Sequence, residues 1–101
     1  MTENRYAVKV PKDLADLVPM FMSNRKKEID ALREAIGASD FEQMRQIGHR
    51  MKGSGRSYGF LLVTELGMRL EEAARNSDGG AAETCVAEYV DYIEKLTITY
   101  E

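Results

Sequence analysis

The residue with the clearest chemical potential is His49, which is the only histidine in this chain of 101 residues. A neutral imidazole is a good nucleophile near pH 7, because its unperturbed pKa is about 6.5. It can accept a phosphoryl group on one ring nitrogen and release it again, since the N–P bond is labile. A lone surface histidine is more often without a function, so its surroundings have to decide between the two interpretations.

A helix is expected to start at Ser39 and to carry His49 near its middle. The run Ser39-Asp40-Phe41-Glu42 has the pattern of a capping box, in which the Ser39 side chain accepts from the Glu42 N–H. At about 100° per residue, the apolar positions of this helix fall in one arc, and His49 lies about 140° from its centre. We therefore expect His49 to face solvent. The positions in the arc are Phe41, Met44, Ile47, Gly48 and Met51.

Two neighbours of His49 on the same face, one turn away, favour a functional interpretation. Lys52 can place a positive charge near phosphoryl oxygens, although a solvated lysine is the simpler alternative. Gly53 costs about 0.8–1.0 kcal/mol relative to alanine in a helix interior. An exposed glycine beside a lone imidazole suggests that something large approaches the ring, and Gly53 is expected to leave room for it.

Three further glycines are expected to help helices pack. Gly48 and Gly55 are seven residues apart and fall on or near the core side, where they would let another helix come close. Gly59 is placed in the same group, and together with Tyr58 it is expected to turn the chain after a helix that runs to about Ser57.

The residues around His49 resemble a known family. The chain matches the pattern H-x-x-K-G-S-x-x-x-x-G of histidine-containing phosphotransfer (HPt) domains, and the later Gly67…Leu70-Glu71-x-Ala73-Ala74 resembles their next helix. Gly55 and Phe60 depart from the residues common in that family, at positions that carry no chemistry. The resemblance covers nearly the whole chain. The matching positions of the first pattern are His49, Lys52, Gly53, Ser54 and Gly59.

The resemblance implies a phosphoryl group on Nε2 of His49, with Lys52 and Gly53 assisting. It also implies response-regulator receiver domains as partners, with a hybrid sensor histidine kinase as a further candidate. The protein would need no cofactor of its own and would not be an enzyme, because the receiver would supply Mg²⁺ and the catalytic groups.

The helix around His49 is locally basic, which would suit the acidic pockets of receiver domains, although arginines also solubilise helices. The Ser54 hydroxyl could bond either to a helix carbonyl or to the site. The candidate docking residues are Arg45, Gln46, Arg50, Ser54 and Arg56, beside Gly53.

Composition excludes several other classes of protein. A net charge of −3 argues against general nucleic-acid binding. Cys85 is the only cysteine, so no intramolecular disulfide is possible, and a reducing cytoplasm is the expected location. No apolar run approaches the roughly 20 residues of a membrane span. One histidine and one cysteine cannot form a usual zinc site. Lys52-Gly53-Ser54 lacks the leading glycine and the strand of a nucleotide-binding loop.

The remaining pattern predicts an all-α fold, namely an antiparallel four-helix bundle with a short N-terminal capping helix. We expect an extended arm over residues 1–10, because no partner strand is evident, and a single helical domain over residues 11–101. More than about two-thirds of the residues should be helical, with no sheet beyond a two-residue bridge. Residues 25–27 are expected on a solvated face, residues 76–80 in a loop, Cys85 in the core and residues 98–100 in a frayed end.

The favoured hypothesis is a phosphorelay intermediate that carries a phosphoryl group on His49 between aspartates of receiver domains. One alternative is a helical-bundle adaptor that binds a partner without phosphate chemistry, so that His49 could be replaced by glutamine. Another is the substrate domain of a larger sensor kinase, although the Met1 start and the short arm favour a free-standing protein. The sequence does not identify the donor, the acceptor or the direction of transfer.

Overall fold

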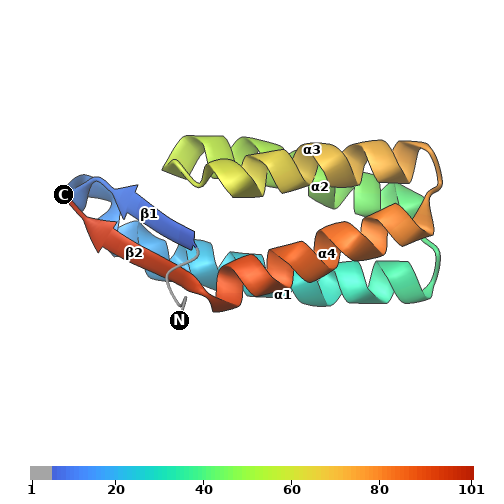
Figure 1. The fold of residues 1–101 in the computed structure, drawn as a ribbon, viewed down its shortest axis with the longest axis horizontal. Helices are drawn as coiled ribbons and strands as arrows, with labels where there is room; N and C mark the ends of the chain where they lie inside the picture. Colours follow the sequence, from blue (N-terminus) through green and yellow to red (C-terminus); the bar gives the residue numbers. More distant parts are fainter. Residues whose placement is uncertain (1–5) are drawn as a thin grey trace.

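The computed structural model describes residues 6–101, which form a bundle of four long helices with a short sheet at one end (Figure 1). The helices are α1 (Val18–Gly37), α2 (Phe41–Tyr58), α3 (Leu61–Arg75) and α4 (Gly79–Glu94). Helices account for 78% of the described residues, so the predicted helical bundle is confirmed. Over this part of the chain, no helix combines the length and the apolar content needed to cross a membrane.

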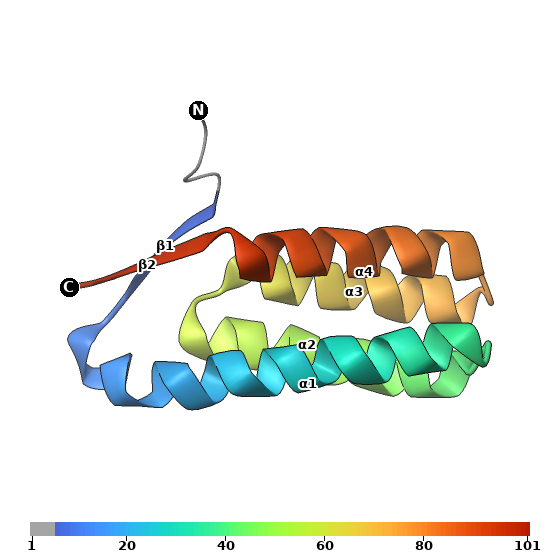
Figure 2. The same cartoon turned by 90° about the horizontal axis from the view of Figure 1, so that it is seen from below.

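Short turns join the helices, so that each lies beside the next and α4 closes the bundle against α1 (Figure 2). The core lies between them. The rings of Phe21 in α1 and Phe60 in the α2–α3 turn are stacked with centroids 4.5 Å apart. Tyr89 of α4 is completely buried. Cys85 is also buried, as its apolar helix face predicts.

The two ends of the described chain form a parallel sheet, in which β1 (Tyr6–Val10) pairs with β2 (Leu96–Tyr100). Residues 6–10 are extended, as expected, but the expectation that they have no partner strand is wrong, and so is the frayed end expected over residues 98–100. Five residue pairs also exceed the two-residue bridge that the all-α prediction allowed. Each strand is short, and its partner lies at the other end of the chain, so neither segment identifies the other by sequence. The prediction for residues 1–5 falls outside the described residues.

The arm is also part of the domain. Val10 is completely buried, and the Tyr6 hydroxyl donates to Asp91 of α4 at 3.2 Å. Tyr6 makes an edge contact with the Tyr92 ring at a centroid distance of 5.0 Å. The boundary predicted between residues 10 and 11 therefore separates segments that pack together.

The segment before α1 is the 3-10 helix η1 (Lys12–Leu17), which runs directly into α1. It has no buried residue. The predicted short N-terminal helix is therefore present as a 3-10 helix, but its role as a cap of the bundle is not confirmed. The change from 3-10 to α geometry falls at Val18, near the break that Pro19 predicts, and Pro19 occupies the first turn of α1.

Helix α2 begins one residue later than its capping box suggests. Asp40 is the N-cap residue, and its Oδ1 accepts from the Gln43 N–H at 3.1 Å. Ser39 instead has φ 52°, because it turns the chain out of α1. At the other end, Gly59 caps α2 with φ 82°, and a Cβ there would meet no atom within 4 Å. Gly59 is therefore a turn residue and not a packing residue, as the left-handed conformation favours glycine.

The loop after α3 is shorter than predicted. Asp78 caps α4 by accepting from the Ala81 N–H at 3.1 Å, so Gly79 and Gly80 belong to the first turn of α4 and not to the loop. Capping by aspartate satisfies the first backbone donors of the helix, and the two glycines can then adopt helical geometry.

Arg25 is buried, contrary to the solvated face predicted for residues 25–27. Its Nε lies 3.0 Å from Glu28 Oε1, and its guanidinium covers the Phe21 ring at 4.6 Å. The Tyr89 hydroxyl donates to Glu28 at 2.8 Å. The ion pair with Glu28 replaces part of the water around the guanidinium, in which Nη2 donates to Glu28 while Nε and Nη1 are buried without a hydrogen-bond partner among the described residues. A charge pattern alone does not reveal such a buried pair. This cluster joins α1 to α4.

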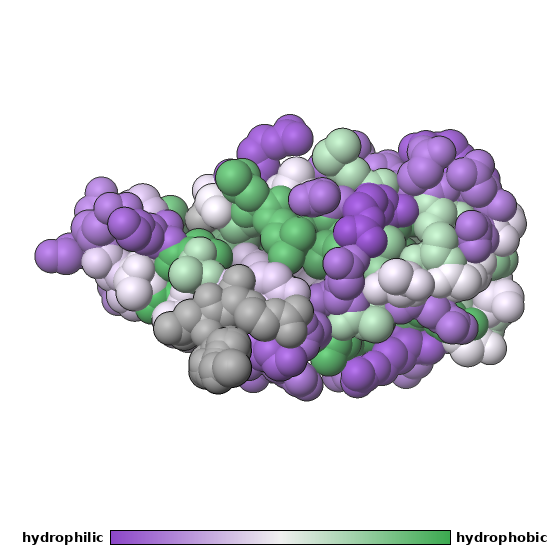
Figure 3. Space-filling model, viewed as in Figure 1, coloured by the Kyte–Doolittle hydropathy of each residue, from purple (hydrophilic) through white to green (hydrophobic). Residues whose placement is uncertain are grey.

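The surface of the bundle carries apolar side chains over α3. Leu61 and Met68 are seven residues apart on that helix and are 72% and 52% exposed. Figure 3 shows apolar surface gathered near the start of α3 and between α3 and α4, with polar surface around it. A shallow groove between β1 and the start of α3 is lined by Val8, Leu62 and Tyr92.

Candidate functional site

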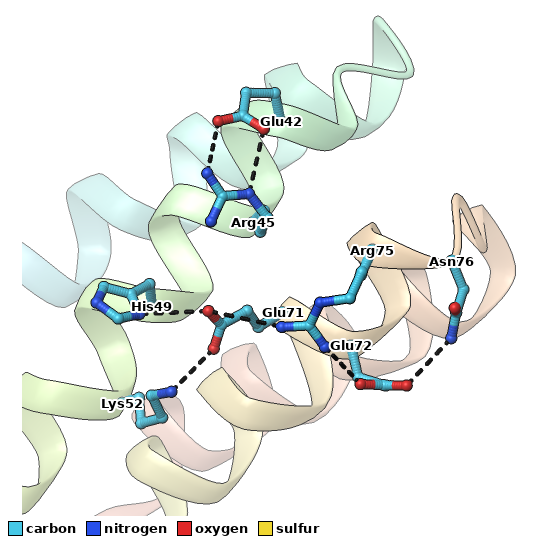
Figure 4. Close-up of polar contacts among 8 residues, drawn as sticks. All are labelled: Glu42, Arg45, His49, Lys52, Glu71, Glu72, Arg75 and Asn76. Atoms are coloured by element: carbon cyan, nitrogen blue, oxygen red, sulfur yellow. Dashed lines mark hydrogen bonds and ion pairs between the residues drawn. The ribbon is translucent and has the colours of Figure 1, made fainter.

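His49 lies in the middle of α2, and its side chain is 66% exposed, as the helical pattern predicts. The ring is nevertheless held at one atom. Its Nδ1 lies 3.3 Å from Oε2 of Glu71, which projects from α3 (Figure 4). One edge of the imidazole thus contacts the neighbouring helix, while the rest of the ring is open to solvent.

The contact with Glu71 determines which nitrogen of neutral His49 is available. A carboxylate can only accept a hydrogen bond, so the proton of the neutral ring belongs on Nδ1. Nε2 then has the free lone pair, and it lies on the side of the ring away from Glu71 (Figure 4). The arrangement therefore presents an exposed nucleophilic nitrogen.

Glu71 connects three basic side chains. Its Oε1 lies 3.1 Å from Nζ of Lys52, and its Oε2 lies 3.9 Å from Nη2 of Arg75 as well as close to His49. Only 10% of the Glu71 side chain is exposed. Burial raises the pKa of this carboxyl, but the hydrogen bond and charge of Lys52, followed by those of His49, outweigh burial and lower the pKa. Glu71 is thus a charged acceptor beneath the ring.

Glycines bring α2 and α3 into backbone contact below the site. A Cβ at Gly48 would lie 2.8 Å from the Gly67 carbonyl oxygen, and a Cβ at Gly67 would lie 2.6 Å from that of Gly48. A Cβ at Gly55 would lie 2.6 Å from both N and Oγ1 of Thr64. Gly48 and Gly55 therefore stand where close helix packing requires glycine.

Lys52 is fixed at its backbone as well as at its ammonium group. The buried Thr64 hydroxyl of α3 donates to the Lys52 carbonyl at 3.0 Å. The Lys52 side chain is 32% exposed, so it can reach solvent while it contacts Glu71. Its Nζ can place a point charge beside a group bound to the ring.

Gly53 faces open space beside this cluster. It is exposed, and a Cβ built on it would meet no atom within 4 Å. Packing within the fold therefore does not explain the glycine, which leaves the predicted clearance for a partner as a proposal.

The other docking candidates differ in their surroundings. Arg45 makes two hydrogen bonds to Glu42 at 2.7 and 3.1 Å, and Gln46 donates to the same carboxylate at 3.1 Å. Arg50 is exposed, and its charge helps to oppose the increase that burial causes in the pKa of Glu28. Part of the predicted basic surface is therefore neutralised within the chain.

The last two docking candidates lie in the C-terminal half of α2. Ser54 is half-buried, and Arg56 is exposed in the last turn. The hydroxyl that bonds back to a helix carbonyl on this stretch belongs to Ser57, which donates to the Gly53 oxygen at 3.1 Å.

Glu71 is the site residue that sequence reasoning did not identify. In the sequence, Glu71 stands only as one residue of the pattern that resembles the next helix of HPt domains, without a role assigned to it. A signal was present, because Gly67, Leu70, Glu71 and Ala74 follow the spacing of one helix face, and all four are buried. A carboxylate on an otherwise apolar face requires a partner, and two of its partners, His49 and Lys52, lie on α2.

The comparisons define the class of protein. The model of the Hpt domain family matches residues 16–97, which is most of the chain, and the chain therefore belongs to the Hpt domain family. No curated protein and no solved structure matches it. Hpt domains are helical phosphocarrier modules of two-component signalling that interact with response-regulator receiver domains. Within residues 6–101, histidine, cysteine and carboxylates form no group of three that could hold a metal ion.

Proposed function

We propose that this protein is a cytoplasmic phosphorelay intermediate that carries a phosphoryl group on Nε2 of His49. The group comes from an aspartyl phosphate on one receiver domain and passes to an aspartate on another. The observation that carries the proposal is the exposed His49 ring, whose Nδ1 lies 3.3 Å from the buried Glu71 carboxylate. This contact leaves Nε2 as the nucleophile and keeps it accessible.

In the proposed transfer step, this chain contributes only the His49 ring and the side chains around it, without a cofactor of its own. The Nε2 lone pair attacks phosphorus, and the bond between phosphorus and the aspartyl oxygen breaks, with its electron pair returning to the aspartate carboxylate. The proton stays on Nδ1, so the phosphorylated ring becomes a cation. Glu71 lies beside that proton and stabilises the developing charge. In the onward step an acceptor carboxylate attacks phosphorus, and the N–P electron pair returns to Nε2.

Lys52 and Gly53 have separate roles in this proposal. Lys52 supplies positive charge to the phosphoryl oxygens, which it can reach by moving its ammonium group away from Glu71. Gly53 leaves space for the incoming receiver, whose carboxylate has to approach in line with the N–P bond.

The partners are receiver domains, and a hybrid sensor histidine kinase is a further candidate source of the group. The receiver supplies Mg²⁺ and the catalytic groups, so the protein acts as a carrier and not as an enzyme. The docking face consists of the α2 surface around His49. Its proposed contact residues are Arg45, Gln46, Arg50, Ser54 and Arg56, beside Gly53.

The direct test is transfer from receiver domains phosphorylated with a radioactive phosphoryl group. We expect a cognate receiver to label this protein on His49 alone, with a label that is labile in acid and stable in base. The variant His49→Gln should lose labelling while its thermal unfolding stays nearly unchanged, since exposed substitutions typically shift stability by within about ±0.5 kcal/mol. Labelling that survives this substitution would exclude His49 as the carrier.

A further inference from the structure

We propose that Gly48 and Gly67 are positioning residues, and that their backbone contact fixes the protonation pattern of His49. By holding α3 close to α2, the two glycines keep the Glu71 carboxylate within reach of Nδ1 and so leave Nε2 unprotonated. The consequence for phosphoryl transfer rests on the proposed function. The effect on the ring does not, because it belongs to the unphosphorylated protein.

The two nearest atoms that a side chain would meet at each of these glycines belong to the backbone of the facing helix, so they cannot shift without moving that helix. A Cβ at Gly48 would lie 2.9 Å from the Glu71 backbone nitrogen, besides its contact with the Gly67 oxygen. A Cβ at Gly67 would lie 2.7 Å from the Lys52 nitrogen, besides its contact with the Gly48 oxygen. Because these are backbone atoms, even one methyl group has to push the helices apart. The backbone that would move carries Glu71 or Lys52.

The contact between His49 and Glu71 is the part of the site most sensitive to that movement. At 3.3 Å it already exceeds the usual range of about 2.7–3.2 Å for an N–H···O bond. The Glu71 side chain is nine-tenths buried, so its neighbours restrict its movement, and the imidazole ring itself is rigid. Lys52 has a long flexible side chain and can follow Glu71. A wider helix spacing should therefore break the His49 contact and keep the Lys52 ion pair.

Nitrogen NMR on the single histidine measures this directly. Spectra are recorded with the ring in its neutral form, and the ¹⁵N shifts report whether Nδ1 or Nε2 carries the proton. We expect the Nδ1–H form in the unsubstituted protein. In Gly67→Ala and Gly48→Ala the Nε2–H form, which dominates in free histidine, should become the major one. Gly37→Ala and Gly53→Ala are matched controls, because both positions face open space, and they should keep the Nδ1–H form.

A folded Gly67→Ala protein that keeps the Nδ1–H form would overturn the proposal. Circular dichroism checks that each variant is folded. If both crowded alanine variants fail to fold, Glu71→Asp tests the same point with the glycines in place. Its side chain is one methylene shorter, so at the native spacing the ring should change to the Nε2–H form. If Glu71→Asp keeps the Nδ1–H form, the contact with Nδ1 does not depend closely on the distance between α2 and α3, and the proposal would also be overturned.

The variant Glu71→Gln distinguishes the effect of an acceptor held near Nδ1 from the effect of the negative charge of Glu71. The amide oxygen can still accept from Nδ1, so this variant should keep the Nδ1–H form although the negative charge is gone. A change to Nε2–H in Glu71→Gln would mean that charge, and not helix spacing, fixes the ring. These spectra involve no phosphate, so a protein that is never labelled on His49 can still pass or fail this test.

Discussion

His49 has two nitrogens in different environments, and this asymmetry is the main chemical feature of the molecule. Nδ1 contacts a buried carboxylate on another helix, whereas the ring as a whole is mostly exposed. Exposure alone would leave the ring free to rotate and to exchange its proton between the nitrogens. Contact with Glu71 orients the ring, so that accessibility and orientation come from different helices.

The charge of Glu71 gives a prediction for stability. Burial raises the pKa of its carboxyl, but Lys52 and His49 outweigh burial and lower it. A carboxyl with a lowered pKa stabilises the fold above its unfolded pKa of about 4.3 and loses this contribution as the pH falls through its folded pKa. We therefore expect Glu71→Gln to reduce the free energy of unfolding more at about pH 7 than at about pH 3.

Urea denaturation of both proteins at the two pH values measures the difference. Comparison of the variant with the parent removes the opposite effect of Glu28, whose pKa is raised mainly by burial. A cost of Glu71→Gln that is equal at both pH values would contradict a net stabilising role for the ionised carboxylate.

Gly53 gives a second prediction at this scale, because stability and function should change in opposite directions. Gly53→Gln should keep or increase the free energy of unfolding, by up to about 1 kcal/mol, since the position is exposed and helical. Transfer from a phosphorylated receiver should nevertheless slow, because the side chain would stand beside the ring where the acceptor approaches.

A matched control is Gly37→Gln, which places the same side chain at another exposed, open glycine, in the last turn of α1. Its transfer rate should equal that of the parent. Equal rates for the two glutamine variants would remove the steric role of Gly53. Lys52→Ala should also slow transfer, but with a smaller change in receiver affinity than Gly53→Gln causes.

At the scale of elements, the candidate site lies on α2 and α3, and α1 and α4 complete the bundle. Helix α2 supplies His49 and Lys52, and α3 supplies Glu71 and the Thr64 hydroxyl that holds the Lys52 carbonyl. On the other side, the buried cluster of Arg25, Glu28 and Tyr89 links α1 to α4. No single helix contains the whole site.

This division explains which elements the sequence could predict. Helix α2 has a strong apolar period, a cap and a family pattern, so its extent and the exposure of His49 follow from local signals. The contact to Glu71 depends on the spacing of two helices, which no local pattern reports. The burial of Arg25 was missed because it depends on tertiary packing: its partner Glu28 accepts from Tyr89 of α4, and this contact between two helices leaves no local pattern.

The sheet was missed because its strands are five residues long and lie at opposite ends of the chain. A short alternation such as Tyr6, Val8 and Val10 is too weak to specify a strand without a partner. Once α1 and α4 lie side by side, the flanking segments come together at one end of the bundle (Figure 1).

The packing of β1 leads to a stability prediction. Val10 is completely buried, so Val10→Ala should lower the free energy of unfolding by about 1–3 kcal/mol through lost burial and a cavity. Thr99→Ala in β2 is the control, because Thr99 is exposed and should change stability by within about ±0.5 kcal/mol. Thermal unfolding compares the two. If residues 6–10 did not pack against the domain, both variants would unfold at the same midpoint temperature as the parent protein.

At the scale of the whole molecule, the proposed function makes the bundle a support that presents one side chain, His49. The core lies between all four helices, and the sheet ties together the two ends of the described chain. The contact of the His49 ring with Glu71 joins α2 to α3, so in this proposal the rest of the fold acts as a frame. Such a frame suits a carrier, because the proposed transfer depends on positioning and on charge supplied by a docked partner.

The central claim is that Nε2 of His49 carries the phosphoryl group while Nδ1 stays bonded to Glu71. The most direct measurement is NMR of the ¹⁵N-labelled protein after phosphorylation by phosphoramidate, a small-molecule donor that replaces the receiver. The account predicts a single phosphohistidine with ³¹P–¹⁵N coupling to Nε2 and with the proton retained on Nδ1. Phosphorylation on Nδ1, or a folded protein that forms no phosphohistidine under conditions that phosphorylate free histidine, would contradict it.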